Sequence, residues 1–286
     1  MTIVCPAKIN LTLEVLDRRA DGYHGIRSVM VPLELADELT IESSSQFVFR
    51  CSDQQIETEN NLAVRAARAV APQLPVALTL EKRVPMQAGL GGGSSDAAAI
   101  LLAAMRGAFG KIDGVDWVAV ARKLGSDVPF FLVESGALVE ATGERVTAIG
   151  ALPAWHVLIV KPPSAVSTAA AYAQLDATPR PSRPRSSSVS LEMVEAIQRG
   201  DFTRARTLLS NDFNDVIAGA VHEVAQALDA LARAGATRPL LSGSGSAVFA
   251  LEESADAIAE IEARLDLPRE FTRIPTAFRR SGTWRA

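Results

Sequence analysis

A glycine-rich stretch constrains the fold of this chain more than any other feature of its sequence. It reads Pro85-Met86-Gln87-Ala88-Gly89-Leu90-Gly91-Gly92-Gly93-Ser94-Ser95-Asp96. Residues 76–82 before it alternate as a strand does, and an alanine- and leucine-rich run to Met105 predicts a helix after it. Glycines let backbone N–H groups converge, and a helix start adds unpaired N–H groups and a positive dipole end. The order strand, glycine loop, helix therefore predicts an anion site, with phosphate as the expected ligand.

Two common phosphate-binding loops do not match this stretch. A Walker A loop ends in Gly-Lys-Ser/Thr, whereas Gly93 is followed by two serines. A dinucleotide fingerprint built on Gly89 and Gly91 needs a third glycine at the position of Ser94. The alternative is a flexible turn before a buried helix. The two serines and the acid at the helix start favour phosphate binding over that alternative.

Composition limits the class of protein. The chain has 286 residues, which suggests two domains or one large one, and its 48% hydrophobic residues are sufficient for a globular core. A formal net charge of −4 argues against a nucleic-acid binder. Cys5 and Cys51 match no metal or redox spacing, and no signal peptide or membrane-spanning run is recognisable. We expect a cytoplasmic protein with no membrane partner.

The N-terminal residues predict a half-buried strand. Apolar residues alternate from Ile3 to Val15, with an interruption expected near Pro6. Lys8 and Asn10 share the mainly polar face and are expected about 7 Å apart. Other elements expected in the first half are strands at 26–35, 38–41 and 46–51 that pair together, a helix to about residue 70 that Asn60-Asn61 can cap, a helix at 116–124, and a β pair over 136–149.

A domain boundary is expected near residues 150–153, which divides the chain into domains 1–152 and 153–286. Thr178 to Ser190 is rich in Pro, Arg and Ser, which predicts an exposed, mobile loop. A second glycine–serine loop follows near the C-terminus, at Ser242-Gly243-Ser244-Gly245-Ser246. Other elements expected here are strands at 155–160 and 247–251, and helices within 166–175 and at 191–199, 201–210, 214–234 and 254–265.

Three motifs together resemble the GHMP kinase superfamily of small-molecule kinases. They are Pro6-Ala7-Lys8-Ile9-Asn10-Leu11, the stretch from Pro85 to Ala98, and Leu241 to Ala247, and they occur in the family's order over nearly the whole chain. The resemblance implies an α+β fold with a βαβ-rich N-terminal ATP-binding domain and a ferredoxin-like C-terminal domain. It places the active site in the cleft between them, and it implies ATP and Mg²⁺.

Two further stretches resemble one branch of that superfamily more closely. They are Asp21-Gly22-Tyr23-His24 and Gly125-Ser126-Asp127-Val128-Pro129-Phe130-Phe131. That branch phosphorylates the tertiary C2 hydroxyl of a cytidine diphosphate-linked sugar alcohol in non-mevalonate isoprenoid synthesis. The alternatives are a homoserine- or mevalonate-type kinase, against which Tyr23 and His24 argue, and a non-catalytic nucleotide sensor, against which Lys8 and Asp127 argue.

The resemblance implies roles for the residues that would carry out the reaction. Asp127 is the candidate base, and Lys8 would keep it ionised and stabilise charge on the moving phosphoryl group. Whether Asp127 takes the proton early or mainly orients the hydroxyl stays open. Asp96, Ser95 or Asp127 could reach the metal, and the metal ligands also stay open because no carboxylate cage is recognisable.

The resemblance also implies binding residues. ATP would be held by residues 85–96 with Asn61 and Lys82, although these two could be a helix cap and a strand-end cation only. Where the family often has more glycine, Met86-Gln87-Ala88 are expected to narrow the adenosine pocket without preventing phosphate binding. The substrate would be bound by Asn10 at its diphosphate or sugar, by Tyr23, His24 and Tyr172 at its base, and by Ser242, Gly243, Ser244 and Gly245. Tyr172 could equally be a core or surface tyrosine.

Overall fold

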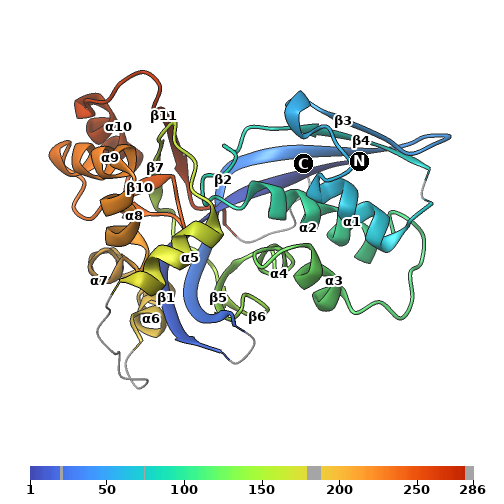
Figure 1. The fold of residues 1–286 in the computed structure, drawn as a ribbon, viewed down its shortest axis with the longest axis horizontal. Coiled ribbons are helices and arrows are strands. Elements are labelled where there is room, and N and C mark those ends of the chain that lie inside the picture. The colour runs from blue at the N-terminus through green and yellow to red at the C-terminus, as the bar shows by residue number, and fades with distance from the viewer. Residues whose placement is uncertain (20–21, 74, 179–187, 281–286) are drawn as a thin grey trace.

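The computed structural model describes residues 1–19, 22–73, 75–178 and 188–280, and two β-sheets organise it (Figure 1). The larger sheet has seven strands, with β3-β4-β2-β1-β8 as its main path and β5 paired to β2 and β6. Its strands are β1 (Thr2–Arg18), β2 (His24–Ser43), β3 (Val48–Cys51), β4 (Val76–Glu81), β5 (Gly136–Ala141), β6 (Arg145–Gly150) and β8 (Ser210–Asn211).

The smaller sheet is antiparallel, in the order β11-β7-β10-β9. Its strands are β7 (His156–Lys161), β9 (Leu240–Leu241), β10 (Val248–Glu252) and β11 (Thr272–Ala277). Helices α8 (Asn214–Ala220), α9 (His222–Arg233) and α10 (Ala255–Arg264) lie beside it (Figure 1). Their apolar residues share one core cluster with Leu158 and Val160 of β7, which fixes this layer to the sheet.

Helix α2 (Gly92–Met105) is the central helix of the first half, and every residue from Ser95 to Ala104 is buried. A helix that is apolar all round belongs inside a protein, and α2 packs between the larger sheet and the shorter helices around it. Those neighbours are α1 (Leu62–Val70), α3 (Trp117–Leu124) and α4 (Val128–Phe131), and the remaining helices are α5 (Thr168–Ala177), α6 (Val189–Arg199) and α7 (Phe202–Leu208).

Strand β1 is buried on both faces, so the expectation of a half-buried strand is wrong. Lys8 is 2% exposed and Asn10 is fully buried, as is Ile9 between them. Distant parts of the chain cover the polar face. Gly91 and Gly243 lie against the Lys8 side chain, and Ser188 and Ser190 at the start of α6 bind Glu14 and Thr12. Pro6 does not interrupt the strand, because a register shift against β2 between Pro6 and Lys8 accommodates it.

Several other expected elements differ from the structure. Strand β3 pairs with β4, in parallel, rather than with β2. The single helix expected over 214–234 is two helices, because Val221 takes an extended conformation with φ −125°. Strands β8 and β11 were not expected. Within the loop expected over 178–190, residues 179–187 lie outside the described residues, and Val189 already begins α6 behind its cap Ser188.

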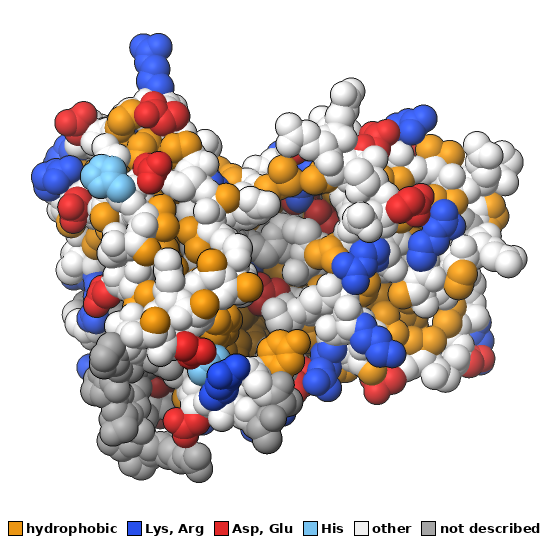
Figure 2. All heavy atoms as spheres, in the orientation of Figure 1, with side chains coloured by type: hydrophobic (Ala, Val, Ile, Leu, Met, Phe, Trp, Pro, Cys, Tyr) orange, Lys and Arg blue, Asp and Glu red, His pale blue; other side chains and the backbone are white. Residues whose placement is uncertain are grey.

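The two sheets share one continuous apolar core across the expected domain boundary. Ile9 and Leu11 of β1 belong to the same cluster as Val157 and Ile159 of β7. The division at residues 152 and 153 stays a prediction. Within the described part of the chain, no helix has both the length and the apolar character to cross a membrane. On the face shown in Figure 2, acidic and basic side chains are interspersed.

Candidate active site

The glycine loop opens α2 as the sequence predicted. Gly91, at φ +72°, takes the N-cap position, and no side chain caps the helix there. Intrahelical bonding begins when the Ser95 N–H donates to the Gly91 carbonyl, at 2.9 Å. The N–H groups of Gly92, Gly93 and Ser94 therefore have no acceptor within the helix and can donate to a ligand. This geometry suits an anion.

The two glycine loops are in direct contact. The Ser242 hydroxyl donates to the Gly89 carbonyl at 3.0 Å, and the Ala247 N–H donates to the Ala88 carbonyl at 3.1 Å. A Cβ on Gly89 would lie 2.0 Å from the Ser242 carbonyl oxygen, and Gly89 itself has φ +73°. Glycine is thus required at this crossing for space and for backbone conformation.

Lys8, Asn10 and Asp127 meet beside these loops. The Lys8 ammonium donates to Asn10 Oδ1 at 2.7 Å and lies 3.4 Å from Asp127 Oδ2. The Lys8 side chain is almost fully buried, whereas that of Asp127 is 30% exposed at the start of α4. A Cβ on Gly243 would lie 3.3 Å from Lys8 Nζ. A buried cation therefore faces a carboxylate that a ligand can reach.

A row of buried polar side chains holds Asn10 in place. Asn10 Nδ2 donates to the Ser28 hydroxyl at 2.8 Å, and that hydroxyl donates to the Thr12 carbonyl at 2.6 Å. The Thr12 hydroxyl lies 2.8 Å from that of Ser190, at the start of α6. Buried polar groups are costly unless they are hydrogen-bonded, so this row explains why the polar face of β1 can be covered.

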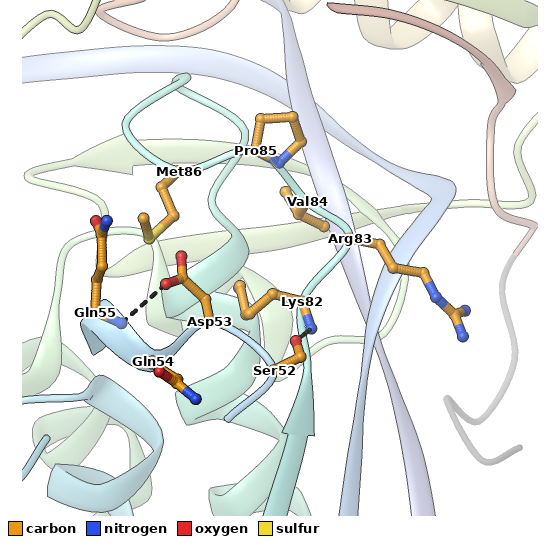
Figure 3. A pocket seen from close by; sticks show the side chains of 9 residues that line it. All are labelled: Ser52, Asp53, Gln54, Gln55, Lys82, Arg83, Val84, Pro85 and Met86. Carbon is orange, nitrogen blue, oxygen red and sulfur yellow. Dashed lines mark hydrogen bonds between the residues drawn. The ribbon is translucent and has the colours of Figure 1, made fainter. Parts of the chain in front are cut away.

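A cavity of about 440 Å³ extends from the glycine loop. Asn60, Asn61, Lys82, residues 84–94 and Asp96 are among its lining residues. Asn61 also caps α1, because its Oδ1 accepts the Ala63 N–H at 2.9 Å. A second cavity, of about 790 Å³, adjoins it and is shown in Figure 3. Its walls are residues 52–55 and 82–86, and Arg83 points away from the rest.

Lys82 lies in a buried cluster of charges beneath these cavities. Its ammonium binds Asp37 Oδ2 and, at 2.9 Å, Asp96 Oδ2. Asp37 Oδ1 also accepts the N–H groups of Arg83 and Val84, at 2.6 and 2.8 Å. Burial, opposed by Lys82 and reinforced by the charge of Asp37, raises the pKa of Asp96 from 3.8 to about 7.

This raised pKa predicts how stability depends on pH. Because folded Asp96 holds its proton to a higher pH than unfolded Asp96, the free energy of unfolding falls as pH rises from about 4 to about 7. Asp96→Asn removes the titration while keeping an oxygen for Lys82. We expect the variant to be more stable than the unmodified chain at pH 8, by about 1–4 kcal/mol, and the gap to narrow toward pH 4. Urea unfolding across this range measures it.

Asp116→Asn is the matched control for this prediction. Asp116 is exposed and caps α3 through its Oδ1, and asparagine caps a helix equally well. Its unfolding curves should follow those of the unmodified chain at every pH. Curves for Asp96→Asn that also run parallel to the unmodified chain would show that Asp96 does not titrate in this range.

The residues expected around the cytidine base lie on β2 and α5. The rings of His24 and Tyr172 stack, with centroids 5.5 Å apart and planes 14° apart. His24 Nε2 lies 2.8 Å from Asp176 Oδ1, and His24 Nδ1 lies 3.1 Å from the Leu16 carbonyl oxygen. Burial and the nearby charge of Asp127 raise the pKa of Tyr172 to about 12. Tyr23 lies at the surface, 70% exposed.

The structure brings most of the expected site residues together. Lys8, Asn10 and Asp127 meet both glycine loops, and Asn61 and Lys82 line the cavity beside the first loop. The second loop reaches α5, because the hydroxyls of Ser244 and Thr168 lie 3.1 Å apart. No sequence pattern indicated Asp37, Asp176 or Asn211, which contact site residues. Each is distant along the chain from the site residue it contacts: Asp37 from Lys82, Asp176 from His24, and Asn211 from Gly243.

Comparison with known proteins identifies the class. The family described as GHMP kinases N terminal domain matches residues 61–135, and GHMP kinases C terminal matches residues 193–267. A solved homoserine kinase from Cytophaga hutchinsonii superposes with a TM-score of 0.71 over 98% of this chain and 94% of that chain, at 15% identity, which shows the fold alone. The chain belongs to the GHMP kinases, a family of ATP-dependent small-molecule kinases.

Within this class the similarity is more specific. A 4-diphosphocytidyl-2-C-methyl-D-erythritol kinase from Citrifermentans bemidjiense is 37% identical over 93% of this chain and 94% of its own length. A solved 4-(cytidine 5'-diphospho)-2C-methyl-D-erythritol kinase is 35% identical, with a TM-score of 0.78 over 97% of this chain and 99% of that one. The chain is thus a member of the 4-diphosphocytidyl-2-C-methyl-D-erythritol kinase family.

Proposed function

We propose that this chain transfers the γ-phosphoryl group of ATP to the C2 hydroxyl of 4-diphosphocytidyl-2-C-methyl-D-erythritol, giving the 2-phosphate and ADP. The observation that carries the proposal is the buried Lys8 ammonium, held 3.4 Å from Asp127 beside both glycine loops. The relatives' names supply the acceptor. The reaction belongs to the non-mevalonate (methylerythritol phosphate) route to isoprenoids, and we propose a cytoplasmic enzyme with no nucleic-acid partner.

ATP binds along the first glycine loop. The free N–H groups at the start of α2 receive its phosphate oxygens, and the helix dipole favours their negative charge. The adenosine lies in the adjoining cavities, against Asn61, Lys82 and Met86. The Lys82 ammonium is already paired with two carboxylates, so Lys82 contributes its alkyl chain and a fixed wall rather than a free charge.

The transfer step uses Asp127 and Lys8. Asp127 accepts the proton of the C2 hydroxyl as its oxygen attacks the γ-phosphorus, and the bond from that phosphorus to the bridging oxygen of ADP breaks. Lys8 lies where negative charge gathers on the moving phosphoryl group and stabilises it. Burial strengthens this effect, because the Lys8 side chain is screened from water.

Two side chains at the loop fit a bound Mg²⁺. The Ser95 hydroxyl and Asp96 Oδ1 are buried and have no hydrogen-bond partner among the described residues. Magnesium commonly takes one or two protein oxygens together with substrate phosphates, and it would offset phosphate charge here. The described residues contain no cluster of three or more His, Cys, Asp or Glu able to hold a metal without the nucleotide.

The acceptor substrate lies on the other side of Asp127. His24, Tyr23 and Tyr172 receive the cytosine, Asn10 contacts the diphosphate or sugar, and the second loop, Ser242 to Gly245, closes the phosphate side. The stacked His24 and Tyr172 rings and the influence of Asp127 on Tyr172 support a base pocket next to the transfer point.

The experiment that tests this function offers ATP with the cytidine substrate, mevalonate or homoserine, and locates the product phosphate by phosphorus NMR. We expect phosphate on the C2 oxygen of the cytidine substrate alone. Turnover of mevalonate or homoserine instead would remove the base-recognition role of Tyr23 and His24. ATP binding without turnover of any acceptor would contradict the proposed reaction and favour a nucleotide sensor.

A further inference from the structure

Both the nitrogen and the oxygen of the Asn211 side-chain amide form hydrogen bonds with the backbone, at and near the second glycine loop. It lies on the two-residue strand β8, which pairs in parallel with β1, and it is 8% exposed. Its Nδ2 donates to the carbonyls of Leu241 and Gly243, at 2.7 and 2.8 Å. Its Oδ1 accepts the Phe213 N–H at 2.9 Å. Both hydrogens of the Asn211 amide nitrogen are therefore donated to the same stretch of chain, residues 241–243.

The stretch that Asn211 holds lies directly on the Lys8 side chain. A Cβ on Gly243 would lie 3.3 Å from Lys8 Nζ and 3.5 Å from Asn10 Oδ1. Gly243 itself has φ +58°, a conformation that favours glycine. The backbone at Gly243 is therefore a wall of the pocket that keeps the Lys8 ammonium between Asn10 and Asp127.

Other contacts hold the loop at different points. The hydroxyls of Ser244 and Thr168 lie 3.1 Å apart, and the Ser246 hydroxyl donates to the Ser164 carbonyl. The Ser242 hydroxyl binds the Gly89 carbonyl, and the Ala247 N–H binds the Ala88 carbonyl. These bonds tie the loop to the first glycine loop. The amide of Asn211 is the contact that draws the Gly243 carbonyl in the opposite direction, toward β8 and β1.

We propose that Asn211 is a positioning residue for phosphoryl transfer. By holding the carbonyls of Leu241 and Gly243, it sets how closely the second loop approaches Lys8, and so fixes the ammonium against Asp127. Asn211 touches neither ATP nor acceptor. The inference rests on the proposed function in one respect, which is that Lys8 and Asp127 carry the transfer.

The chain offers a matched pair of substitutions. Asn211→Asp keeps the size of the side chain and an acceptor for the Phe213 N–H, but replaces both donated hydrogen bonds by repulsion between oxygens. Asn214→Asp introduces the same charge three residues away. Asn214 Oδ1 accepts the Leu241 N–H at 3.1 Å, so aspartate preserves that contact with the same strand.

Each variant is tested by two measurements, its kinetic constants and the chemical reactivity of Lys8. We expect Asn211→Asp to lower kcat about 10²-fold, because small misplacements of a catalytic group are costly, while the KM for ATP changes little. We also expect Lys8 to become reactive toward an amine-labelling reagent, read by mass spectrometry against Lys111, whose side chain is 83% exposed. Asn214→Asp should keep the kcat and the Lys8 protection of the unmodified chain.

The labelling result separates this inference from the reaction itself, because it needs no turnover. A loss of kcat in Asn211→Asp with Lys8 still protected would overturn the proposal, as would an unchanged kcat. If Asn211→Asp fails to fold, Gly243→Ala displaces the same wall from the Lys8 side. It should expose Lys8 and lower kcat in the same way, and protection of Lys8 in that variant would overturn the proposal.

Discussion

Asp127→Asn is expected to abolish nearly all turnover while leaving ATP binding intact. The amide keeps the shape of the side chain but cannot accept the C2 hydroxyl proton, and removing a general base costs about 10²–10⁴-fold in kcat. The Asp127 side chain is 30% exposed and makes no capping hydrogen bond in α4, so we expect the fold to be kept. The substitution also removes the charged partner of Lys8, which keeps its hydrogen bond to Asn10. Single-turnover kinetics and calorimetric titration with ATP measure the two quantities.

Asp116→Asn provides the control for chemistry as well as for stability, because Asp116 is an exposed aspartate at the start of the preceding helix. Its kcat should equal that of the unmodified chain. Full turnover by Asp127→Asn would show that the proton leaves by another route, and that Asp127 at most orients the acceptor. Loss of ATP binding in the same variant would mean that Asp127 serves the nucleotide instead.

Gly89→Ala is expected to damage stability and turnover together. Its Cβ would lie 2.0 Å from the Ser242 carbonyl oxygen. Neither atom can rotate aside, because the Cβ is fixed directly to the backbone and the oxygen belongs to it. The two glycine loops must therefore separate. We expect a loss of about 2–4 kcal/mol in the free energy of unfolding from the clash and the positive φ, measured by urea denaturation. We also expect kcat to fall at least about 10²-fold, because the loops frame the transfer site.

Gly107→Ala separates the two causes. Gly107 has φ +82°, close to the +73° of Gly89, but nothing lies within 4 Å of its Cβ position. It should lose only about 1 kcal/mol to backbone strain and keep its kcat. Equal losses in the two variants would mean that the conformation of Gly89, rather than its contact with Ser242, is what the loop requires.

Local sequence signals predicted the parts of the site that depend on neighbouring residues. The strand, glycine loop and helix order around Gly91 is confirmed, and so is the Asn61 cap of α1, because both follow from residues a few positions apart. The surroundings of Lys82 could not be predicted in this way. Its partner Asp37 is 45 residues away on another strand, and only the pairing of β2 with β4 brings them together.

Burial was also mispredicted where it depends on distant layers. Alternation along β1 indicates an exposed polar face, and no residue near Lys8 or Asn10 in the sequence indicates that the distant Gly243 will lie against both side chains. The sequence compensates with partners from far along the chain, such as Ser190 for Thr12. The break at Val221 did have a local signal, because Gly219 lies two residues before it and glycine is a poor helix former.

The position of strand β1 at the start of the chain affects how the protein folds during its synthesis. The Val15 N–H is held by Asp212, which follows it by 197 residues. At ribosomal rates of about 5–20 residues per second, the partner emerges on the order of 10–40 seconds after the strand. Until β7 emerges, the apolar residues of β1 that later meet it lack their cover. These apolar residues are therefore accessible to chaperones for a long time during synthesis. Truncated chains that lack the second half should aggregate rather than fold on their own.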